Sequence, residues 1–193
     1  ELGKKVLSDL GFKIKEGKTI GKIRWWAAGT PQEVAEDINS MFADKNIKAI
    51  MTQTGGYSAM TVLEYLDYEL ITNNPKPFIG MSDVTNFHTA FFTKCGMVGF
   101  HMDDVTFGLG HAWGEEEEYL AQFDKDMFTR FLMQAEAPGI INPLTEWEGW
   151  RKGSASGNLM GGNLHLFANL LGTEYFPPKE IFDGAVLFWE EVG

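Results

Sequence analysis

The stretch from Pro75 to Phe87 constrains the fold of this 193-residue chain most strongly. A short apolar run from Pro77 to Gly80 stops at a glycine, and a segment with helical character begins after Ser82 and Asp83. A strand that turns this sharply into a helix forms a β–α unit, and the turn exposes a side chain beside the free amides of the helix start. The stretch therefore predicts an α/β unit with a serine at its turn.

Two interpretations of Ser82 follow from this pattern alone. A serine on a strand-to-helix turn can be the nucleophile of an elbow motif, but that motif ends in glycine, and Val84 stands at the position in question. Serine is also a favoured N-cap, and the local pattern by itself favours the cap. The remainder of the chain has to decide between the two.

Strand-like and helical patterns alternate along the first two thirds of the chain. Thr30 to Glu33 form a capping box with proline at the first helical position, which predicts a helix start. Further helices are expected at Tyr57–Leu66, Asp83–Lys94 and Met127–Ala135, and strands at Phe12–Ile14, Ile47–Met51, Phe78–Gly80 and Met97–His101. We therefore predict an α/β fold, a doubly wound, mostly parallel sheet with helices on both faces.

The pattern changes after residue 137. Prolines, glycines and two tryptophans fill residues 138–153, which we interpret as a linker between domains. Residues 1–137 are then an N-terminal α/β domain, and residues 154–193 are the incomplete beginning of a smaller, mixed β-rich C-terminal domain.

Composition excludes several classes of function. A formal net charge of −11 argues against nucleic-acid binding, which needs a basic surface. No apolar run approaches the roughly 20 residues that span a membrane. The single cysteine, Cys95, excludes an internal disulfide and suits a reducing compartment, so we expect a cytoplasmic protein.

The chain resembles the LD-carboxypeptidase family of serine peptidases, which includes the microcin-immunity carboxypeptidases. Four blocks carry the resemblance in the family's order: Ala35–Asn39 with Met41–Asp44, Ile47–Ile50 and Gly55–Tyr57; Asn74–Thr85; Gly157–Leu164 with Gly172–Tyr175; and Gly184–Glu191. Four ordered blocks that cover nearly the whole chain are far more specific than any one of them. Beside them, the nucleophile interpretation of Ser82 becomes the favoured one.

The resemblance implies a Ser-Glu-His triad. Ser82 is its nucleophile, and Glu190, at the end of an apolar strand-like run, orients the histidine. The family's catalytic histidine is expected beyond Gly193, so the chain reads as a fragment that lacks the first strand and the C-terminal segment and is inactive alone. The pattern alone favours the alternative, in which Glu190 is a surface acid at a strand end.

An acyl transfer to Ser82 needs preorganised donors for the oxyanion. The N–H of Asp83 and an N–H of Gly55 or Gly56 are the expected oxyanion hole, because glycine lets the backbone approach a substrate closely. The alternative for the two glycines is a simple turn.

Three further residues are candidate substrate contacts. His101 ends a strand on the expected rim of the sheet, where the family shows a histidine or tyrosine followed by Gly-Pro, but Met102, Asp103 and Asp104 follow here. Trp147 and Trp150 resemble the immunity branch, and they either line a pocket or pack the domain junction. Asp103, Asp104 and His101 are a weak pattern for a metal site, and we expect neither metal nor cofactor.

We therefore expect a serine carboxypeptidase that hydrolyses an amide bond near the C-terminus of a small peptide or peptide conjugate. The resemblance leaves two substrate classes open, LD-linked muropeptides and peptide-nucleotide antibiotics, and it implies a homodimer. The alternative is a non-catalytic small-molecule-binding protein or a degenerate family member.

Overall fold

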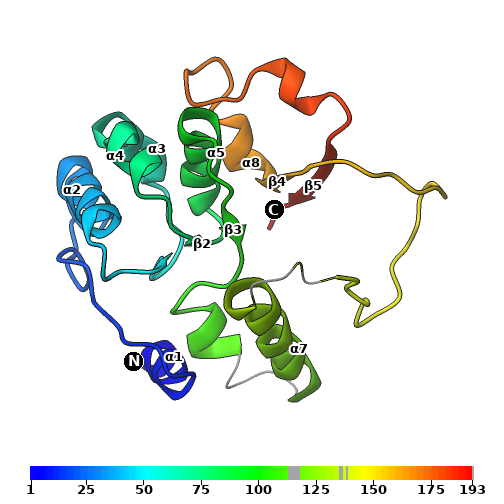
Figure 1. Cartoon of the computed structure of the whole chain (residues 1–193), viewed down its shortest axis with the longest axis horizontal. Coiled ribbons are helices and arrows are strands. Elements are labelled where there is room, and N and C mark those ends of the chain that lie inside the picture. Colours follow the sequence, from blue (N-terminus) through cyan, green and yellow to red (C-terminus); the bar gives the residue numbers. More distant parts are fainter. Residues whose placement is uncertain (113–117, 135–136, 138, 193) are drawn as a thin grey trace.

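A computed structural model describes residues 1–112, 118–134, 137 and 139–192 of the chain (Figure 1). Its centre is a parallel sheet of three short strands in the order β1-β2-β3, which are Ile50–Met51, Phe78–Gly80 and Phe100–His101. Ile50 pairs with Phe78, and Gly80 pairs with His101. The sheet therefore aligns the ends of β2 and β3 side by side.

The chain also forms helices and helical turns. They are α1 (Leu2–Asp9), α2 (Pro31–Ala43), α3 (Ala59–Val62), the 3₁₀ turn η1 (Leu63–Tyr65), α4 (Tyr68–Asn73), α5 (Val84–Cys95), the π-helical turns η2 (Gly108–Ala112) and η3 (Thr129–Met133), α7 (Glu118–Phe128), α8 (Leu164–Ala168) and the 3₁₀ turn η4 (Lys179–Phe182). The predicted capping box starts α2, because the Thr30 hydroxyl accepts from the Glu33 N–H while the Glu33 carboxylate accepts from the Thr30 N–H.

Two apolar clusters lie on opposite faces of the sheet. On one face, Ile50 and Phe78 pack with residues of α2, α3, α4 and α5, and Phe42, Phe78 and Phe91 contact one another ring to ring. The other cluster joins Met51 and Met102 to residues of α1, η2 and α7. Successive strand residues point to opposite faces, so both faces are covered. The predicted α/β fold with helices on both faces is confirmed.

Several predicted boundaries were wrong. Phe12–Ile14 forms no strand, since no described strand lies beside it, and Phe12 instead packs edge-on against Phe128. The helix expected at Met127–Ala135 begins earlier, at Glu118, and continues after Phe128 as the π-helical turn η3. The strands are also shorter than the apolar runs suggested, because a residue counts as part of a strand only where it pairs with a residue of a neighbouring strand.

A second, two-stranded sheet follows in the C-terminal part. Its strands β4 (Leu159–Asn163) and β5 (Val186–Glu190) are parallel, and Asn163 pairs with Glu190. A mixed sheet is not seen within the described residues. The predicted domain limits stay a prediction, and Pro138 and Gly193 lie outside the described residues.

Residues 139–158, which include most of the predicted linker, contain neither helix nor strand, and Figure 1 shows this yellow segment arching away from the rest of the chain. Among the described residues, no helix has the length and apolar character that crossing a membrane requires.

Candidate active site

Ser82 lies on a sharp turn between β2 and α5. Its backbone has a φ of 59°, and within the described residues only one other non-glycine residue, Trp25, has a positive φ. A left-handed conformation costs an L-residue about 1–2 kcal/mol, so such residues tend to mark functional sites. Just before the turn, Gly80 has a φ of 155°, and a Cβ there would lie 2.2 Å from Thr52 Oγ1. Only glycine fits at that position.

The turn also excludes one interpretation of Ser82. The N-cap of α5 is Asp83, and the helix start has no side-chain cap. The suggestion that Ser82 is an ordinary helix cap is therefore wrong. Its conformation fits the elbow of a nucleophile, while its catalytic role stays a prediction.

Gly55 lies directly against Ser82. A Cβ built on Gly55 would come within 2.9 Å of Ser82 Cβ and 3.1 Å of Ser82 Oγ. Gly56 has a φ of 155°, in the region that favours glycine. The backbone of this loop is thus close to the serine hydroxyl because these two residues have no side chains.

The Asp83 carboxylate connects this loop to the elbow. Its Oδ2 accepts hydrogen bonds from the backbone N–H groups of Ser58 (2.7 Å) and Ala59 (2.8 Å), and its Oδ1 accepts one from Asn86 Nδ2 (2.9 Å). The Asp83 side chain is buried, so these bonds replace its lost hydration. Asp83 therefore fixes the position of the loop that carries Gly55 and Gly56.

Three backbone N–H groups near Ser82 donate no hydrogen bond to another backbone group within the described residues. In the described part of the chain, no carbonyl accepts from the N–H of Gly55, Gly56 or Asp83. Amides in this state can donate to a developing oxyanion. The arrangement is compatible with the predicted oxyanion hole, which stays a prediction.

Glu190 lies at the end of β5 and contacts His101 from the other sheet. His101 Nε2 is 3.6 Å from Glu190 Oε1, and the His101 ring packs against Phe188 with centroids 5.5 Å apart. Burial lowers the pKa of His101, and the nearby Glu190 carboxylate opposes this shift only in part. His101 is thus a half-buried neighbour of Glu190, with no hydrogen-bond partner for Nδ1 among the described residues.

His88 points toward the sheet. Its Nε2 lies 3.1 Å from the Phe78 carbonyl oxygen, and its ring meets the His101 ring with centroids 6.3 Å apart. Burial, together with nearby His101, lowers the pKa of His88 to about 4. His88 therefore makes a structural contact with β2.

Sequence reasoning missed the contact that joins the second sheet to the elbow. The Asn163 N–H donates to Thr85 Oγ1 at 3.1 Å, and a Cβ on Gly162 would lie 2.8 Å from the same oxygen. Thr85 is fully buried in the first turn of α5, three residues after Ser82. The signal in the sequence that could have indicated this contact was Thr85 itself, a short polar residue in a buried helix turn. This contact brings β4, and with it the paired strand end at Glu190, to the elbow.

Glu191, which the sequence left without a role, holds the start of α8. Its carboxylate accepts from the backbone N–H groups of His165 (3.1 Å) and Val192 (3.0 Å). The hydrogen bond from Val192, with smaller contributions from His165 and Asn163, lowers the pKa of Glu191.

The structure does not bring Trp147 and Trp150 into the site. Their side chains are 74% and 93% exposed, on the segment that leaves the body of the chain. Their predicted contact with substrate stays a prediction.

The sequence suggested His101, Asp103 and Asp104 as a weak pattern for a metal site, and Asp104 has backbone partners instead. Asp104 Oδ1 accepts from the backbone N–H groups of Thr106 and Phe107, which fixes the loop after β3. The described residues contain no group of three His, Cys, Asp or Glu side chains arranged to hold a metal ion.

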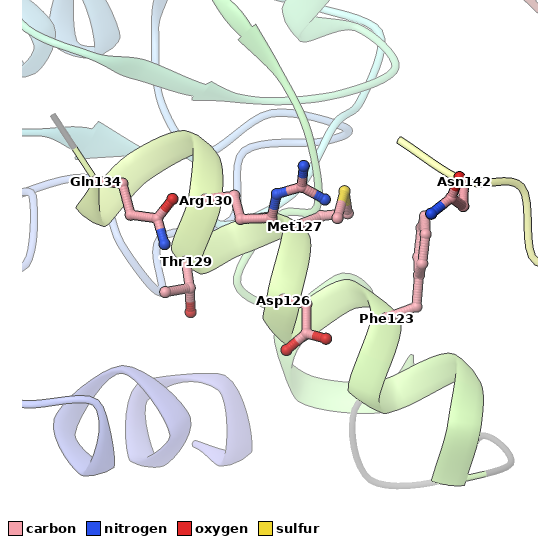
Figure 2. A pocket seen from close by; sticks show the side chains of 7 residues that line it. All are labelled: Phe123, Asp126, Met127, Thr129, Arg130, Gln134 and Asn142. Atoms are coloured by element: carbon pink, nitrogen blue, oxygen red, sulfur yellow. The ribbon is translucent and has the colours of Figure 1, made fainter. Parts of the chain in front are cut away.

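A separate cavity of about 380 Å³ lies beside α7 and η3 (Figure 2). Its lining is Phe123, Asp126, Met127, Thr129, Arg130, Gln134 and Asn142. None of the predicted site residues contributes to it, so it is distinct from the Ser82 site.

Comparisons with known proteins identify the family and the fold of the chain. Residues 1–102 match the LD-carboxypeptidase N-terminal domain, and residues 156–193 match the LD-carboxypeptidase C-terminal domain. A probable murein peptide carboxypeptidase of Bacillus subtilis is 34% identical over 189 residues, which cover 96% of this chain and 55% of the relative. The microcin C7 self-immunity protein MccF of Escherichia coli is 28% identical over 213 residues, covering 98% and 60%. The chain thus spans little more than half the length of these relatives.

Solved structures show the same fold. MccF in complex with glutamyl sulfamoyl guanosine superposes with a TM-score of 0.83 at 26% identity, covering 98% of this chain and 62% of that one. An MccF-like protein from Bacillus anthracis gives a TM-score of 0.82 at 30% identity, covering 98% and 60%. Because the N-terminal domain match alone takes in more than half of its residues, the chain belongs to the LD-carboxypeptidase family.

Proposed function

We propose that the protein containing this chain is a serine carboxypeptidase that acts by acyl transfer to Ser82 and then to water. The observation that carries the proposal is the strained elbow: Ser82 has a φ of 59° with Gly55 packed against its hydroxyl. A strained, non-glycine residue between a strand and a helix presents its side chain to a substrate with little freedom to move away.

We assign each residue of the site a role from its place at the turn, in the loop or at the strand end. Ser82 attacks the carbonyl carbon of the scissile amide, and the N–H groups of Asp83 and of Gly55 or Gly56 stabilise the oxyanion. Glu190 orients the histidine that takes the serine proton, a residue we expect to follow Gly193 in the complete protein. The amine leaves with that proton, and water then releases the acyl group.

The substrate is proposed as a small peptide or peptide conjugate. Support comes from relatives: one is named for murein peptides, and structures of MccF hold glutamyl sulfamoyl guanosine and aspartyl sulfamoyl adenosine. Of the two classes we propose the peptide conjugate, and the same resemblance leads us to propose a cytoplasmic homodimer.

The test is hydrolysis followed by mass spectrometry, with the complete protein that contains this sequence and its Ser82→Ala variant. The panel contains an LD-linked muropeptide and an aminoacyl-sulfamoyl nucleotide. Cleavage of either one that disappears in the variant supports the proposal and selects the substrate class. Cleavage that persists in Ser82→Ala, or no cleavage by a folded wild-type protein, contradicts it and favours a binding role.

A further inference from the structure

A pair of exposed tryptophans lies on the loop before α2. The side chains of Trp25 and Trp26 are 78% and 69% exposed, and their rings stack with centroids 5.6 Å apart and planes inclined by 28°. The Arg24 guanidinium carbon lies 5.2 Å from the Trp25 ring centroid. Arg24 and Ala27 exchange two backbone hydrogen bonds, of 2.8 and 3.0 Å, which close a tight turn around the two indoles.

This turn is strained as well as apolar. Trp25 has a φ of 54°, and the other described non-glycine residue with a positive φ is Ser82. A bulky residue in this conformation is a genuine outlier, and indoles that stay 78% and 69% exposed gain little from burial. Strain that is kept at a surface indicates a function for the conformation it produces.

The indoles border a cavity of about 200 Å³. Its wall combines the turn with the starts of two helices, and its lining is Arg24, Trp25, Trp26, Ala27, Gly29, Pro31, Val34, Ser58, Thr61 and Val62. Most of this wall is apolar, while Arg24 and the Ser58 hydroxyl add donors, since the Thr61 hydroxyl already donates to the Ser58 carbonyl oxygen. Such a combination suits an organic ring that has an apolar face and a few polar atoms at its edge.

The cavity is connected to the elbow through one short loop. Ser58, in the cavity wall, donates its N–H to Asp83, the residue after Ser82. Three residues earlier in the same loop, Gly55 lies against the Ser82 side chain. The loop from Gly55 to Ser58 therefore contributes to the cavity wall at one end and lies against the Ser82 side chain at the other.

We propose that the cavity at Trp25 and Trp26 binds a ring of the substrate through its apolar face, at the end remote from the bond that Ser82 cleaves. This inference rests on the proposed function and extends it to the substrate's second half. Indoles stack on nucleobases and also on the apolar face of a sugar ring, and a guanidinium donates to carbonyl, hydroxyl or phosphate oxygens. A nucleobase and an amino sugar are two sources of the same ring chemistry.

A direct binding experiment tests the site without relying on hydrolysis. Adenosine and N-acetylglucosamine are titrated separately into the ¹⁵N-labelled complete protein, and the indole N–H signals of Trp25 and Trp26 are assigned with single Phe variants. We expect saturable shifts of both signals with at least one probe, and the probe that causes them identifies the source. If neither probe moves either signal, the site is not a ring subsite.

Kinetics provide the second measurement. For the Trp25→Ala/Trp26→Ala double variant, we expect the preference for a ring-bearing conjugate over the corresponding free peptide, as a ratio of kcat/KM values, to fall about tenfold. The matched Trp25→Phe/Trp26→Phe variant keeps aromatic faces and should keep most of the preference. An unchanged ratio in the Ala variant overturns the inference, even where Ser82→Ala confirms the serine mechanism.

A second copy of the chain is the other occupant that an exposed aromatic surface could take. Sedimentation of the double Ala variant distinguishes it. Dissociation of an oligomer, together with unmoved indole signals in the titrations, would assign the surface to self-association and overturn the proposal. If no substrate is hydrolysed at all, the proposed function fails, and the titration still decides whether the cavity binds rings.

Discussion

His101 and Glu190 connect the two sheets of this chain, with His101 Nε2 3.6 Å from Glu190 Oε1. His101 ends β3 and Glu190 ends β5, so the contact is between two strand ends that are 89 residues apart in the sequence. Burial lowers the pKa of His101, which favours its neutral form, and the 3.6 Å contact with Glu190 is longer than a hydrogen bond. We infer that His101 positions Glu190 without itself touching the reacting atoms.

A substitution at His101 should therefore change kcat more than it changes KM. We expect His101→Ala to lower kcat about tenfold with a smaller change in KM, and His101→Gln, which keeps a donor, to restore part of the loss. The acidic limb of the kcat–pH profile should shift in both variants, an effect that a purely structural role would not produce. A raised KM with unchanged kcat would instead support a substrate contact, as the sequence suggested.

Glu190 itself should matter far more. Glu190→Gln removes the charge that stabilises the developing imidazolium, and a fall in kcat of about a thousandfold is expected by analogy with other triads. The matched control is Glu191→Gln, since Glu191 binds backbone groups at the start of α8. That variant should lose stability with a smaller effect on kcat. A larger loss of kcat in Glu191→Gln than in Glu190→Gln would reverse the assignment.

Two variants of Ser82 separate strain from chemistry. Both Ser82→Ala and Ser82→Gly remove the nucleophile, but only glycine relieves the φ of 59°. We expect Ser82→Gly to be more stable than Ser82→Ala by about 1 kcal/mol in urea unfolding, and neither to hydrolyse substrate. Equal stabilities would mean that the turn relaxes in the free protein.

The loop at Gly55 should be intolerant of any side chain. Gly55→Ala places a Cβ within 2.9 Å of Ser82 Cβ, so either the loop or the serine must move. We expect a fall in kcat of at least a hundredfold, because displaced donors no longer meet the oxyanion. Gly149→Ala is the matched control, since a Cβ there meets nothing within 4 Å. Similar activities of the two variants would exclude Gly55 from the oxyanion hole.

Much of the fold could be predicted because its signals are local. Each of three signals depends on only a few neighbouring residues, and each was followed by the expected structure. They are the Thr30 capping box at the start of α2, the buried run that forms β2, and Gly80 at the turn before Ser82. Phe12–Ile14 failed because a strand also needs a partner strand, which its own residues cannot specify.

The site was predictable only in part. Motif order pointed to Ser82 and Gly55, but the contacts that assemble them depend on residues distant in sequence. Asp83 holds Ser58 across 25 residues, and Thr85 accepts from Asn163 across 78. The exposure of Trp25 and Trp26 could not be predicted, because the segment around them has no helical or strand periodicity that would show which side chains face solvent.

His88 should make the fold sensitive to mild acid. Its pKa is lowered to about 4 by burial, whereas a histidine in the unfolded chain titrates near 6.5, so the unfolded state binds more protons between these values. Stability is therefore full above about pH 6.5 and is lost as pH falls toward 4, by an amount on the order of 2–3 kcal/mol.

Urea unfolding at pH 7.5, 6, 5 and 4 tests this dependence. His88→Gln keeps a donor for the Phe78 carbonyl and removes the titrating group, so its stability should fall less steeply with acidification than that of the wild type. His165→Gln, at an exposed histidine, should retain the wild-type slope. Parallel slopes for wild type and His88→Gln would mean that His88 is protonated in the folded protein, and the loss of stability in acid would then come from the carboxylates and His101.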